Sequence, residues 1–385
     1  MLAMNYRGPR RVRIDEKPEP KIQHPQDAIV KVTRACICGS DLHLYNGSVP
    51  DTRIGTTFGH EVVGVIEETG SEVSNLKKGD RVLVPFNIAC GKCVFCKQGL
   101  FGNCHESNPE ATAVGGIIGY SHTAGGYDGG QAEYVRVPYS DVGPMVIPEW
   151  MDDDTAVLLT DIVPTGYQAA EMGGIQKGDT VVVFGAGPVG IMAARSAWLF
   201  GAERVIVIDH IDYRLEFVEK YAPAEVYNYN DLPDVVLFLK QTTGWLGADV
   251  CIDAVGAEAT GRPMQMLFGK KLHMTGGSAT ALHWAINGVR KGGVVSVVGV
   301  YGPIDTMVPI GNMVNKGLTM RGNQAAVKRH LPKLVEHVKN GIIDPKPLIT
   351  HHIPLEEISD AYKMFSAKLD NMIKPVLVPP SASVH

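Results

Sequence analysis

The chain has 385 residues, of which 45% are hydrophobic and 20% are charged, a balance typical of a folded protein with about two or three domains. Thirty-six basic residues against 41 acidic ones leave a net charge of −5, and neither sign forms a long run, so nucleic-acid and membrane partners are not indicated. No stretch approaches the roughly 18 uninterrupted apolar residues that a membrane-spanning helix needs.

Short β-strands separated by turns are predicted in the first third of the chain. They cover residues 28–33, 61–67, 81–84 and 132–137, where runs of β-branched residues are broken by Gly, Pro and Asp. This pattern predicts a compact domain that is rich in antiparallel sheet.

Two possible metal ligands, Cys38 and His60, lie within this predicted sheet domain. A thiolate and an imidazole suit zinc, but two ligands do not define a site. Asp161, where the first domain passes into the next, is the candidate third ligand; the three would leave a fourth position open, as catalytic zinc needs. Asp161 could instead cap a helix that begins near Pro164. Glu61 remains either an alternative or transient ligand or a base that orients the other residues.

Four cysteines form the most specific pattern in the chain: Cys90, Cys93, Cys96 and Cys104 are separated by two, two and seven residues. Thiolates so spaced can place their sulfurs ~2.3 Å from one ion, and a short return loop supplies the fourth. A disulfide cluster is the alternative, but no apolar signal segment directs the chain to an oxidising compartment. The spacing predicts a structural zinc lobe over residues 88–106, in a protein that we expect in the reduced cytoplasm.

From about residue 161 onward, β-strand patterns alternate with helical ones. Alternation of this kind predicts a parallel, doubly wound α/β sheet. The predicted strands cover residues 180–184, 204–208, 248–255 and 293–298, and the predicted helices cover 189–200 and 281–289.

The tail of the chain carries a predicted helix over residues 330–339 and a last strand over 373–378. A lone helix and strand cannot bury a core, so we expect the tail to return to the first domain. The prediction is therefore a catalytic zinc domain over 1–161, a nucleotide-binding domain over 162–324 and a return to the catalytic domain over 325–385.

A glycine turn follows the predicted strand 180–184. Gly185 permits the tight turn, Gly187 lets the backbone approach a pyrophosphate, and Gly190 allows close packing of helix on strand. Pro188 and Val189 open the helix, whose free N–H groups attract phosphates. The alternative is a turn that merely connects strand and helix.

Acidic and apolar residues at the ends of later strands complete the predicted cofactor site. Asp209 would accept hydrogen bonds from both hydroxyls of the adenosine ribose and repel a 2′-phosphate, which favours NAD, while the nearby Arg214 keeps NADP open. Val255 and Val298 end parallel strands and would form the floor of the nicotinamide pocket.

Together these segments resemble the zinc-dependent medium-chain alcohol dehydrogenase family over nearly the whole chain. The resemblance implies a Rossmann domain plus a β-rich GroES-like catalytic domain, two zinc ions per chain, NAD as cofactor and a homotetramer. The matching segments are CGSDLH at 38–43, GHE at 59–61, the four-cysteine lobe at 90–104, DGGQAEYVRVP at 128–138, GAGPVG at 185–190 and Asp209.

The resemblance also implies roles for individual residues. Cys38 and His60 would hold the catalytic zinc, and Ser40 and His43 would form a proton relay. Asp161 stands where many members carry a second cysteine; an aspartate followed by Pro-Thr-Gly-Tyr looks like the branch of glutathione-independent formaldehyde dehydrogenases, which favours Asp161 as a ligand.

Two further positions bear on substrate and cofactor. Phe86 would line the substrate pocket, or else be a core aromatic at a strand end. Gly39 stands where liver-type alcohol dehydrogenases carry a pyrophosphate-binding arginine, so phosphate neutralisation would fall to the helix terminus and to Lys374 or Arg321.

The sequence thus predicts a zinc-dependent, NAD(P)-dependent alcohol dehydrogenase that acts on a small alcohol or an aldehyde hydrate such as that of formaldehyde. A polyol or L-threonine dehydrogenase, with Glu61 more directly involved, is the alternative within the same scaffold. A non-catalytic NAD-binding protein is the alternative from another class, and it would need no open zinc site.

Overall fold

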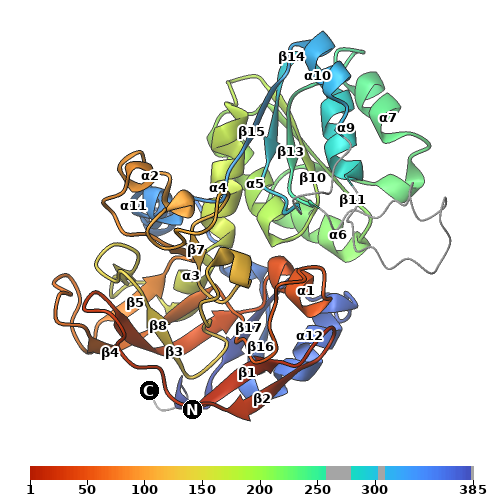
Figure 1. The fold of residues 1–385 in the computed structure, drawn as a ribbon. Coiled ribbons are helices and arrows are strands. Elements are labelled where there is room, and N and C mark those ends of the chain that lie inside the picture. Colours follow the sequence, from red (N-terminus) through yellow and green to blue (C-terminus); the bar gives the residue numbers. More distant parts are fainter. Residues whose placement is uncertain (257–278, 302–307, 383–385) are drawn as a thin grey trace. The chain divides into compact units, whose positions relative to one another are not determined.

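The computed structural model describes residues 1–256, 279–301 and 308–382 (Figure 1). Across these three ranges, no helix combines the length and the apolar character that crossing a membrane requires.

The contacts within the chain define two compact units. The first unit joins Met1–Pro164 to Gln324–His385, and the second unit is Thr165–Asn323. The helix α4 (Ile162–Gly173) begins in the first unit and continues into the second.

A mostly antiparallel sheet, in which only β16 and β17 pair in parallel among the described residues, organises the first unit around β3 (Ala28–Cys36). The sheet order within the described residues is β16-β17-β3-β4-β5-β9, and β8 also pairs with β3. The strand β17 (Lys374–Val378), from the tail of the chain, pairs with β3 so that Val376 lies opposite Cys36. The tail therefore supplies two strands, β16 and β17, to the sheet that the N-terminal segment begins.

Helix α12 (Ile358–Ser366) packs on this unit through one apolar face. Ile358, Ala361, Tyr362 and Phe365 recur at helical spacing and all are buried in the main core of the unit. Each large side chain contributes roughly 1.5–3 kcal/mol by its removal from water, so α12 is firmly attached to the sheet.

The second unit is built on a parallel sheet in the order β12-β11-β10-β13-β14-β15. Its central strand β10 (Thr180–Phe184) is a run of apolar residues buried on both faces, as expected for a parallel strand covered by helices. Figure 1 shows α5 on one face of this sheet and α9 on the other. The predicted doubly wound Rossmann sheet is therefore confirmed.

The carboxyl ends of the central strands of the second unit meet at one edge of its sheet. In the register of the parallel pairs, Phe184 lies opposite both Ile208 and Asp253, and Asp253 lies opposite Val297. Open α/β sheets bind their ligands at such an edge, so the loops that follow these four strands form the cofactor side of the unit.

The remaining elements have the following bounds. In the first unit they are β1 (Leu2–Tyr6), β2 (Val12–Glu16), α1 (Gly39–Tyr45), β4 (Val62–Thr69), β5 (Arg81–Val84), β6 (Asn87–Ile88), α2 (Val94–Lys97), η1 (Phe101–Asn103), β7 (Gly116–Ile117), η2 (His122–Ala124), β8 (Tyr134–Val137), β9 (Met145–Val146), α3 (Asp153–Leu158), α11 (Val327–Lys339), η4 (Lys346–Leu348), β16 (Ile349–Pro354), η5 (Leu355–Glu357) and η6 (Pro380–Ala382). In the second unit they are α5 (Pro188–Leu199), β11 (Arg204–Asp209), α6 (Asp212–Tyr221), β12 (Glu225–Asn228), η3 (Tyr229–Asp231), α7 (Val235–Thr242), β13 (Ala248–Asp253), α9 (Thr280–Gly288), β14 (Val289–Val297), α10 (Ile310–Lys316) and β15 (Thr319–Gly322).

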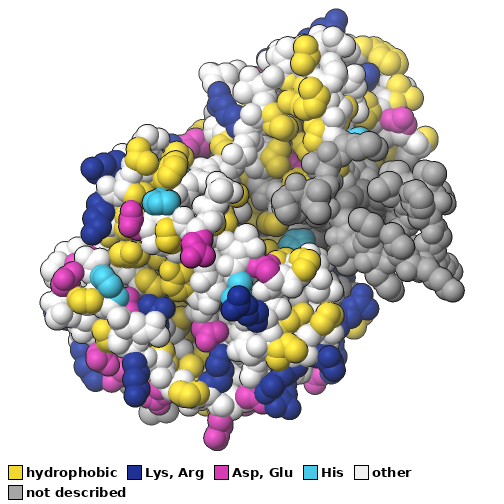
Figure 2. All heavy atoms as spheres, in the orientation of Figure 1, with side chains coloured by type: hydrophobic (Ala, Val, Ile, Leu, Met, Phe, Trp, Pro, Cys, Tyr) yellow, Lys and Arg dark blue, Asp and Glu magenta, His cyan; other side chains and the backbone are white. Residues whose placement is uncertain are grey.

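Charged side chains of both signs are mixed on the displayed surface of the first unit. Figure 2 shows Lys and Arg interspersed with Asp and Glu across this face. No single sign of charge dominates the part of the surface that this view displays.

Candidate functional site

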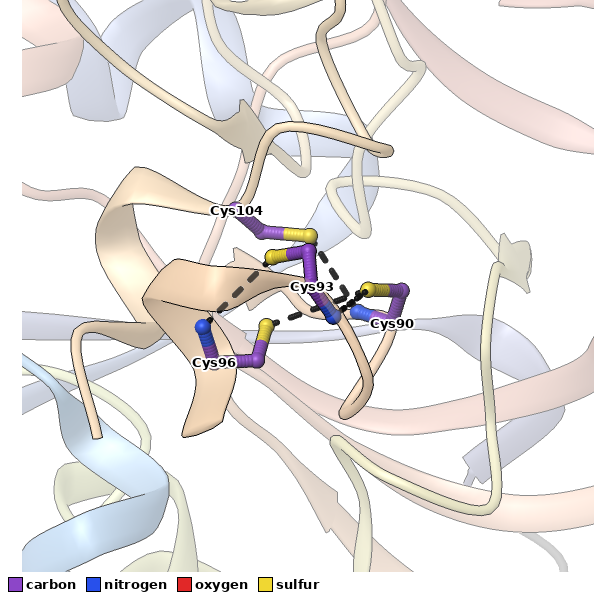
Figure 3. A group of neighbouring side chains, drawn as sticks. All are labelled: Cys90, Cys93, Cys96 and Cys104. Carbon is purple, nitrogen blue, oxygen red and sulfur yellow. Dashed lines mark hydrogen bonds between the residues drawn. The ribbon is translucent and has the colours of Figure 1, made fainter. Parts of the chain in front are cut away.

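The four lobe cysteines converge on one point (Figure 3). The sulfurs of Cys90, Cys93, Cys96 and Cys104 all lie within 4.8 Å of one another. Cys93 begins helix α2, and its sulfur accepts a hydrogen bond from the backbone N–H of Cys96 at 3.5 Å. The short helix thus turns two of the four sulfurs toward the same space.

The spacing of these sulfurs fits a tetrahedral metal ion. The Cys90 and Cys96 sulfurs are 4.0 Å apart, and an ion with Zn–S bonds of ~2.3 Å would separate them by ~3.8 Å. All four cysteines are free thiols. Their local geometry therefore suits a structural zinc ion.

The electrostatics of the lobe also favour a cation. Burial opposes the charge on Cys93, but the backbone N–H groups of Cys96 and His105 outweigh it and lower the pKa of Cys93 to about 6. Burial and the neighbouring Cys93 and Cys104 raise the pKa of Cys96. Cys93 therefore forms its thiolate readily, whereas Cys96 would lose its proton more easily with a positive charge between the sulfurs.

A second cluster brings together three residues that are distant in the sequence. Cys38 precedes helix α1, His60 lies just before β4, and Asp161 directly precedes α4. Asp161 Oδ2 lies 3.5 Å from Cys38 Sγ and 3.4 Å from His60 Nε2. Zinc at ~2.0–2.3 Å from each atom would give separations of ~3.3–3.5 Å, so these three donors fit one ion.

The pairing of β3 with β4 explains why Cys38 and His60 meet. Ala35 lies opposite Val62 at the ends of these antiparallel strands, and the N–H of Cys36 donates to the carbonyl of Glu61 at 3.3 Å. The residues that follow β3 and those that precede β4 therefore lie at the same end of the sheet.

The Asp41 carboxylate lies beside one nitrogen of the His60 ring. His60 Nδ1 lies 3.3 Å from Asp41 Oδ1, while Nε2 points toward Asp161 and toward Ser40 Oγ at 3.3 Å. A histidine that turns one nitrogen to a carboxylate presents the lone pair of the other to a metal. The ring is therefore oriented as a zinc ligand requires.

The charges around His60 favour a cation at this position. Burial alone would lower the pKa of His60, but the carboxylates of Asp41 and Asp161 raise it well above its ordinary value. The same carboxylates would attract a divalent metal ion.

Glu61 and Lys374 form a buried ion pair beside the cluster. Both side chains have no solvent exposure, and the Lys374 ammonium bonds to Glu61 Oε1. Burial raises the pKa of Glu61, and Lys374 opposes that effect. Glu61 Oε2 is buried and has no hydrogen-bond partner among the described residues, which leaves this oxygen as the one that could turn toward a metal.

The structure contradicts the phosphate-binding role that was predicted for Lys374. An ammonium with no solvent exposure that is already paired with Glu61 is not available to neutralise a phosphate. Lys374 instead neutralises a carboxylate next to the candidate metal ligands. Arg321 belongs to the second unit and donates to the carbonyl of Met172 at 3.2 Å.

Aromatic and polar side chains surround the second cluster. Phe86 is buried and meets His60 edge-on, with ring centroids 6.0 Å apart. Tyr120 meets the same ring edge-on at 6.4 Å. Ser40 and His43 lie on α1, with Ser40 next to His60 and His43 three residues further along the helix. The cluster therefore has an aromatic wall, and helix α1 carries a hydroxyl next to it and an imidazole one turn further on.

The glycine turn has the geometry of a phosphate-binding loop. Gly185 has φ = +99°, and a Cβ at Gly190 would lie 1.9 Å from the carbonyl oxygen of Gly185, so only glycine fits there. Gly187 precedes helix α5, which begins at Pro188 and continues through Val189. The free N–H groups at the start of this twelve-residue helix can receive an anion.

Asp209 ends β11 directly beside this turn. Its Oδ2 accepts the N–H of Ala186 at 2.6 Å and its Oδ1 accepts the N–H of His210 at 2.6 Å. Burial opposes its charge, but these hydrogen bonds and the nearby Arg214 keep the pKa of Asp209 below its ordinary value. A fixed carboxylate anion therefore lies where a ribose could donate to it.

Val255 and Val298 follow β13 and β14 and are tied to one acidic residue. The N–H of Val255 donates to the Asp253 side chain at 3.0 Å, and the N–H of Val298 donates to the Asp253 carbonyl at 3.0 Å. Tyr301 also donates to the Asp253 carboxylate. These bonds hold the two loops together at the carboxyl edge of the sheet.

Three residues of the site were not singled out from the sequence. Asp41 could have been found, because an acidic residue three positions after Cys38 is a sign of helix capping. Tyr120 lies in a loop without a periodic pattern, and Gln131 bonds to Asp41 across 90 residues of sequence. No local signal points to either of these two.

Comparisons with known proteins agree with this geometry. The family profile described as "Alcohol dehydrogenase GroES-like domain" matches residues 24–149, and the one described as "Zinc-binding dehydrogenase" matches residues 188–270. The chain is similar to the uncharacterized zinc-type alcohol dehydrogenase-like protein AdhB of Bacillus subtilis, with 42% identity over 98% of this chain and 100% of AdhB. It is 38% identical to a glutathione-independent formaldehyde dehydrogenase of Pseudomonas aeruginosa, over 77% of this chain and 74% of that protein.

Solved structures show the same likeness. The alcohol dehydrogenase TADH from Thermus sp. ATN1 superposes with a TM-score of 0.84 at 34% identity, covering 98% of this chain and all of the other. A dehydrogenase from Escherichia coli in complex with NADH superposes with a TM-score of 0.79 at 26% identity, over 98% of this chain and 99% of that chain. The predicted GroES-like and Rossmann fold class is confirmed, and the comparisons support zinc and NAD(H) as the cofactors. The chain belongs to the zinc-type alcohol dehydrogenases of the medium-chain dehydrogenase/reductase family.

Proposed function

We propose that this oxidoreductase catalyses the NAD-linked oxidation of a small alcohol or of an aldehyde hydrate such as that of formaldehyde, together with the reverse reduction. In the oxidation the substrate C–H bond breaks, and the hydrogen passes with both bonding electrons, as hydride, to the nicotinamide. The O–H proton leaves to the protein, and a C=O bond forms.

The observation that carries the proposal is the group formed by Cys38, His60 and Asp161. Its sulfur, nitrogen and oxygen donors lie within 4.8 Å of one another, and three protein ligands leave one coordination position for a substrate oxygen, as in catalytic zinc sites. When bound, zinc supplies a Lewis acid that lowers the pKa of a substrate hydroxyl. The lobe cysteines would hold a second, structural zinc.

The residues of the chain would orient the substrate and remove its proton. Asp41 lies beside His60 Nδ1, and His60 Nε2 faces the Asp161 carboxylate, as two ligands of one metal ion would. Ser40, 3.3 Å from that nitrogen, would accept the hydroxyl proton, and His43 would pass it to solvent. Phe86 and Tyr120 would exclude water from the same position.

An aldehyde hydrate is favoured as substrate because the segment that contains Asp161 resembles that of the formaldehyde dehydrogenases. The Pseudomonas aeruginosa relative of that name supports this direction. NAD is favoured over NADP because the Asp209 carboxylate is charged and lies next to the glycine turn. A homotetramer is proposed from the family resemblance alone.

The experiment is a turnover screen of purified protein with NAD against formaldehyde, short primary alcohols, polyols and L-threonine, with zinc quantified in the same sample. The proposal expects the highest kcat/KM for formaldehyde or a short alcohol, and about two zinc ions per chain. Highest turnover on a polyol or threonine would replace the substrate class. One zinc ion per chain and no turnover on any of these compounds would contradict the proposal.

A further inference from the structure

A chain of buried hydrogen bonds runs from helix α12 to the candidate metal ligands. The Tyr362 hydroxyl donates to Gln131 Oε1 at 2.9 Å, and Gln131 Nε2 donates to Asp41 Oδ2 at 3.1 Å. Gln131 Nε2 also donates to the Cys36 carbonyl at 3.0 Å. Tyr362, Gln131 and Asp41 have no solvent exposure, so water cannot replace any of these bonds.

The chemistry of the partners fixes the orientation of the Gln131 amide. The Asp41 carboxylate and the Cys36 carbonyl only accept hydrogen bonds, so the amide must turn its NH₂ group to them. Its oxygen then faces Tyr362, whose hydroxyl has one proton to donate. A flipped amide would place its oxygen against a carboxylate and a carbonyl, which is unfavourable.

Asp41 connects this chain to two of the candidate ligands at once. Its Oδ2 accepts the backbone N–H of Cys38 at 2.9 Å, and its Oδ1 faces His60 Nδ1 at 3.3 Å. A displacement of this carboxylate would move the backbone of one ligand and release the ring of the other. Partners behind metal ligands typically change metal affinity about 10–100-fold when they are lost.

Gln131 is also held against the loop that carries His60. Its N–H donates to the carbonyl of Phe58 at 3.0 Å, and the N–H of Gly130 donates to the carbonyl of Gly59 at 2.8 Å. Gly59 has φ = +102°, and a Cβ there would lie 2.5 Å from Gln131 Cγ. The loop therefore approaches Gln131 as closely as a glycine allows, and Gln131 contacts the ligand loop and the Asp41 carboxylate together.

We propose that Gln131 and Tyr362 are positioning residues of the metal centre, which act through Asp41 on Cys38 and His60. This inference rests on the proposed function, because it assumes a zinc ion on those ligands. It assigns to the tail of the chain a part in holding the metal, although the three candidate ligands lie outside the tail.

The test is the rate at which zinc leaves the intact protein to a chelator, with the two ions distinguished by their rates. Tyr362→Phe keeps the aromatic ring and nearly the same volume, but it removes the hydroxyl proton that bonds to the Gln131 amide. Release of zinc from the Cys38 site should therefore accelerate about fivefold to tenfold, which is the effect of one lost hydrogen bond. Release from the lobe should not change. Tyr45→Phe is the matched control, because its ring packs against that of Tyr362, with centroids 5.0 Å apart, outside the hydrogen-bonded chain.

Two further measurements separate positioning from general stability. A structural role would lower the melting temperatures of the zinc-free and zinc-loaded proteins equally, whereas positioning lowers chiefly the gain that zinc confers. In an Asp41→Asn background, Tyr362→Phe should no longer accelerate release, since its effect passes through Asp41. Gln131→Met provides a second variant if Tyr362→Phe does not fold, and it should accelerate release at least as much.

The outcomes distinguish this inference from the proposed function. Unchanged release in both Tyr362→Phe and Gln131→Met, with zinc present in the wild type, would overturn the inference and leave the proposed function standing. A wild-type protein that never holds zinc at Cys38 would overturn both. Equal acceleration in Tyr45→Phe would show that the loss of either hydroxyl loosens the site, and it would overturn the role given to the hydrogen bond between Tyr362 and Gln131.

Discussion

Replacing Asp161 with asparagine is the sharpest perturbation of the candidate metal centre. The side chain keeps its shape, but a charged ligand becomes a neutral amide. Asp161 Oδ2 lies at 3.4–3.5 Å from both the His60 nitrogen and the Cys38 sulfur, so a tetrahedral ion would lose one of three protein ligands. The remaining two donors cannot hold zinc tightly by themselves.

The size of the effect follows from this position. A partner behind a ligand is typically worth about 10–100-fold in metal affinity, and a direct ligand should be worth at least as much. A hundredfold loss corresponds to about 2.7 kcal/mol. We expect Asp161→Asn to lose zinc during dialysis against a weak chelator, with turnover reduced at least as far, while NAD affinity and the lobe zinc stay near wild type.

The assay is zinc content per chain together with NAD-linked turnover after the same dialysis. Asp154→Asn is the control, because it makes the same chemical change on α3 of the same unit, where the carboxylate pairs with Arg34. Asp161→Cys should retain zinc, since a thiolate is an equally suitable ligand. Wild-type zinc content and turnover in Asp161→Asn would refute the reasoning.

Three other predictions concern the cofactor turn, the lobe and the tail. Asp209→Gly should lower the ratio of kcat/KM with NAD to that with NADP by about tenfold or more, because a charge-assisted hydrogen bond is worth ~1.5–3 kcal/mol; an unaltered ratio would remove Asp209 from cofactor selection. Cys104→Ala should remove one zinc ion and lower the melting temperature by several degrees; full zinc content would contradict a site in the lobe. Burial, aided by Arg329 and Lys333, lowers the pKa of His330 to about 4. In the unfolded chain His330 binds a proton below pH ~6.5, whereas in the folded chain it does not do so until about pH 4. The free energy of unfolding therefore falls as the pH decreases from ~6.5 to ~4, by roughly 2–3 kcal/mol. Denaturant unfolding should therefore show a weaker pH dependence for His330→Gln than for the wild type over that range, and identical slopes would contradict the assignment.

The sequence predicted the nucleotide-binding sheet well because its strands carry strong local signals. The run TVVVF was predicted as a strand over residues 180–184, and β10 has these bounds. The edge strands β12 and β15 were not predicted. They are only four residues long and largely exposed, so they lack the apolar pattern that marks a buried strand.

In the first unit, the elements that were missed depend on long-range pairing. The strands β1 and β2 form a hairpin of mixed polarity, and β16 alternates between partly buried and exposed residues. Lys374 shows most clearly that long-range pairing cannot be predicted from local sequence. It lies in a predicted strand and could be interpreted as a free cation, yet the pairing of β17 with β3 buries it against Glu61, 313 residues away.

The lobe cysteines could be named from the sequence because zinc demands particular residue types at short spacing, whereas Cys38, His60 and Asp161 were named from their residue types and from the family resemblance. The residues that hold those ligands could not, because glutamine and tyrosine have no such restricted chemistry. Gln131 and Tyr362 are separated by 231 residues and meet only in the folded chain. The positions of such supporting residues follow from packing, which a single sequence does not display.

The most direct test of the account is anomalous diffraction from crystals of the zinc-loaded protein, recorded on both sides of the zinc absorption edge. The account predicts two peaks per chain, one among the four lobe sulfurs and one between Cys38, His60 and Asp161. A single peak in the lobe, with none beside His60 in protein that turns over substrate, would contradict it.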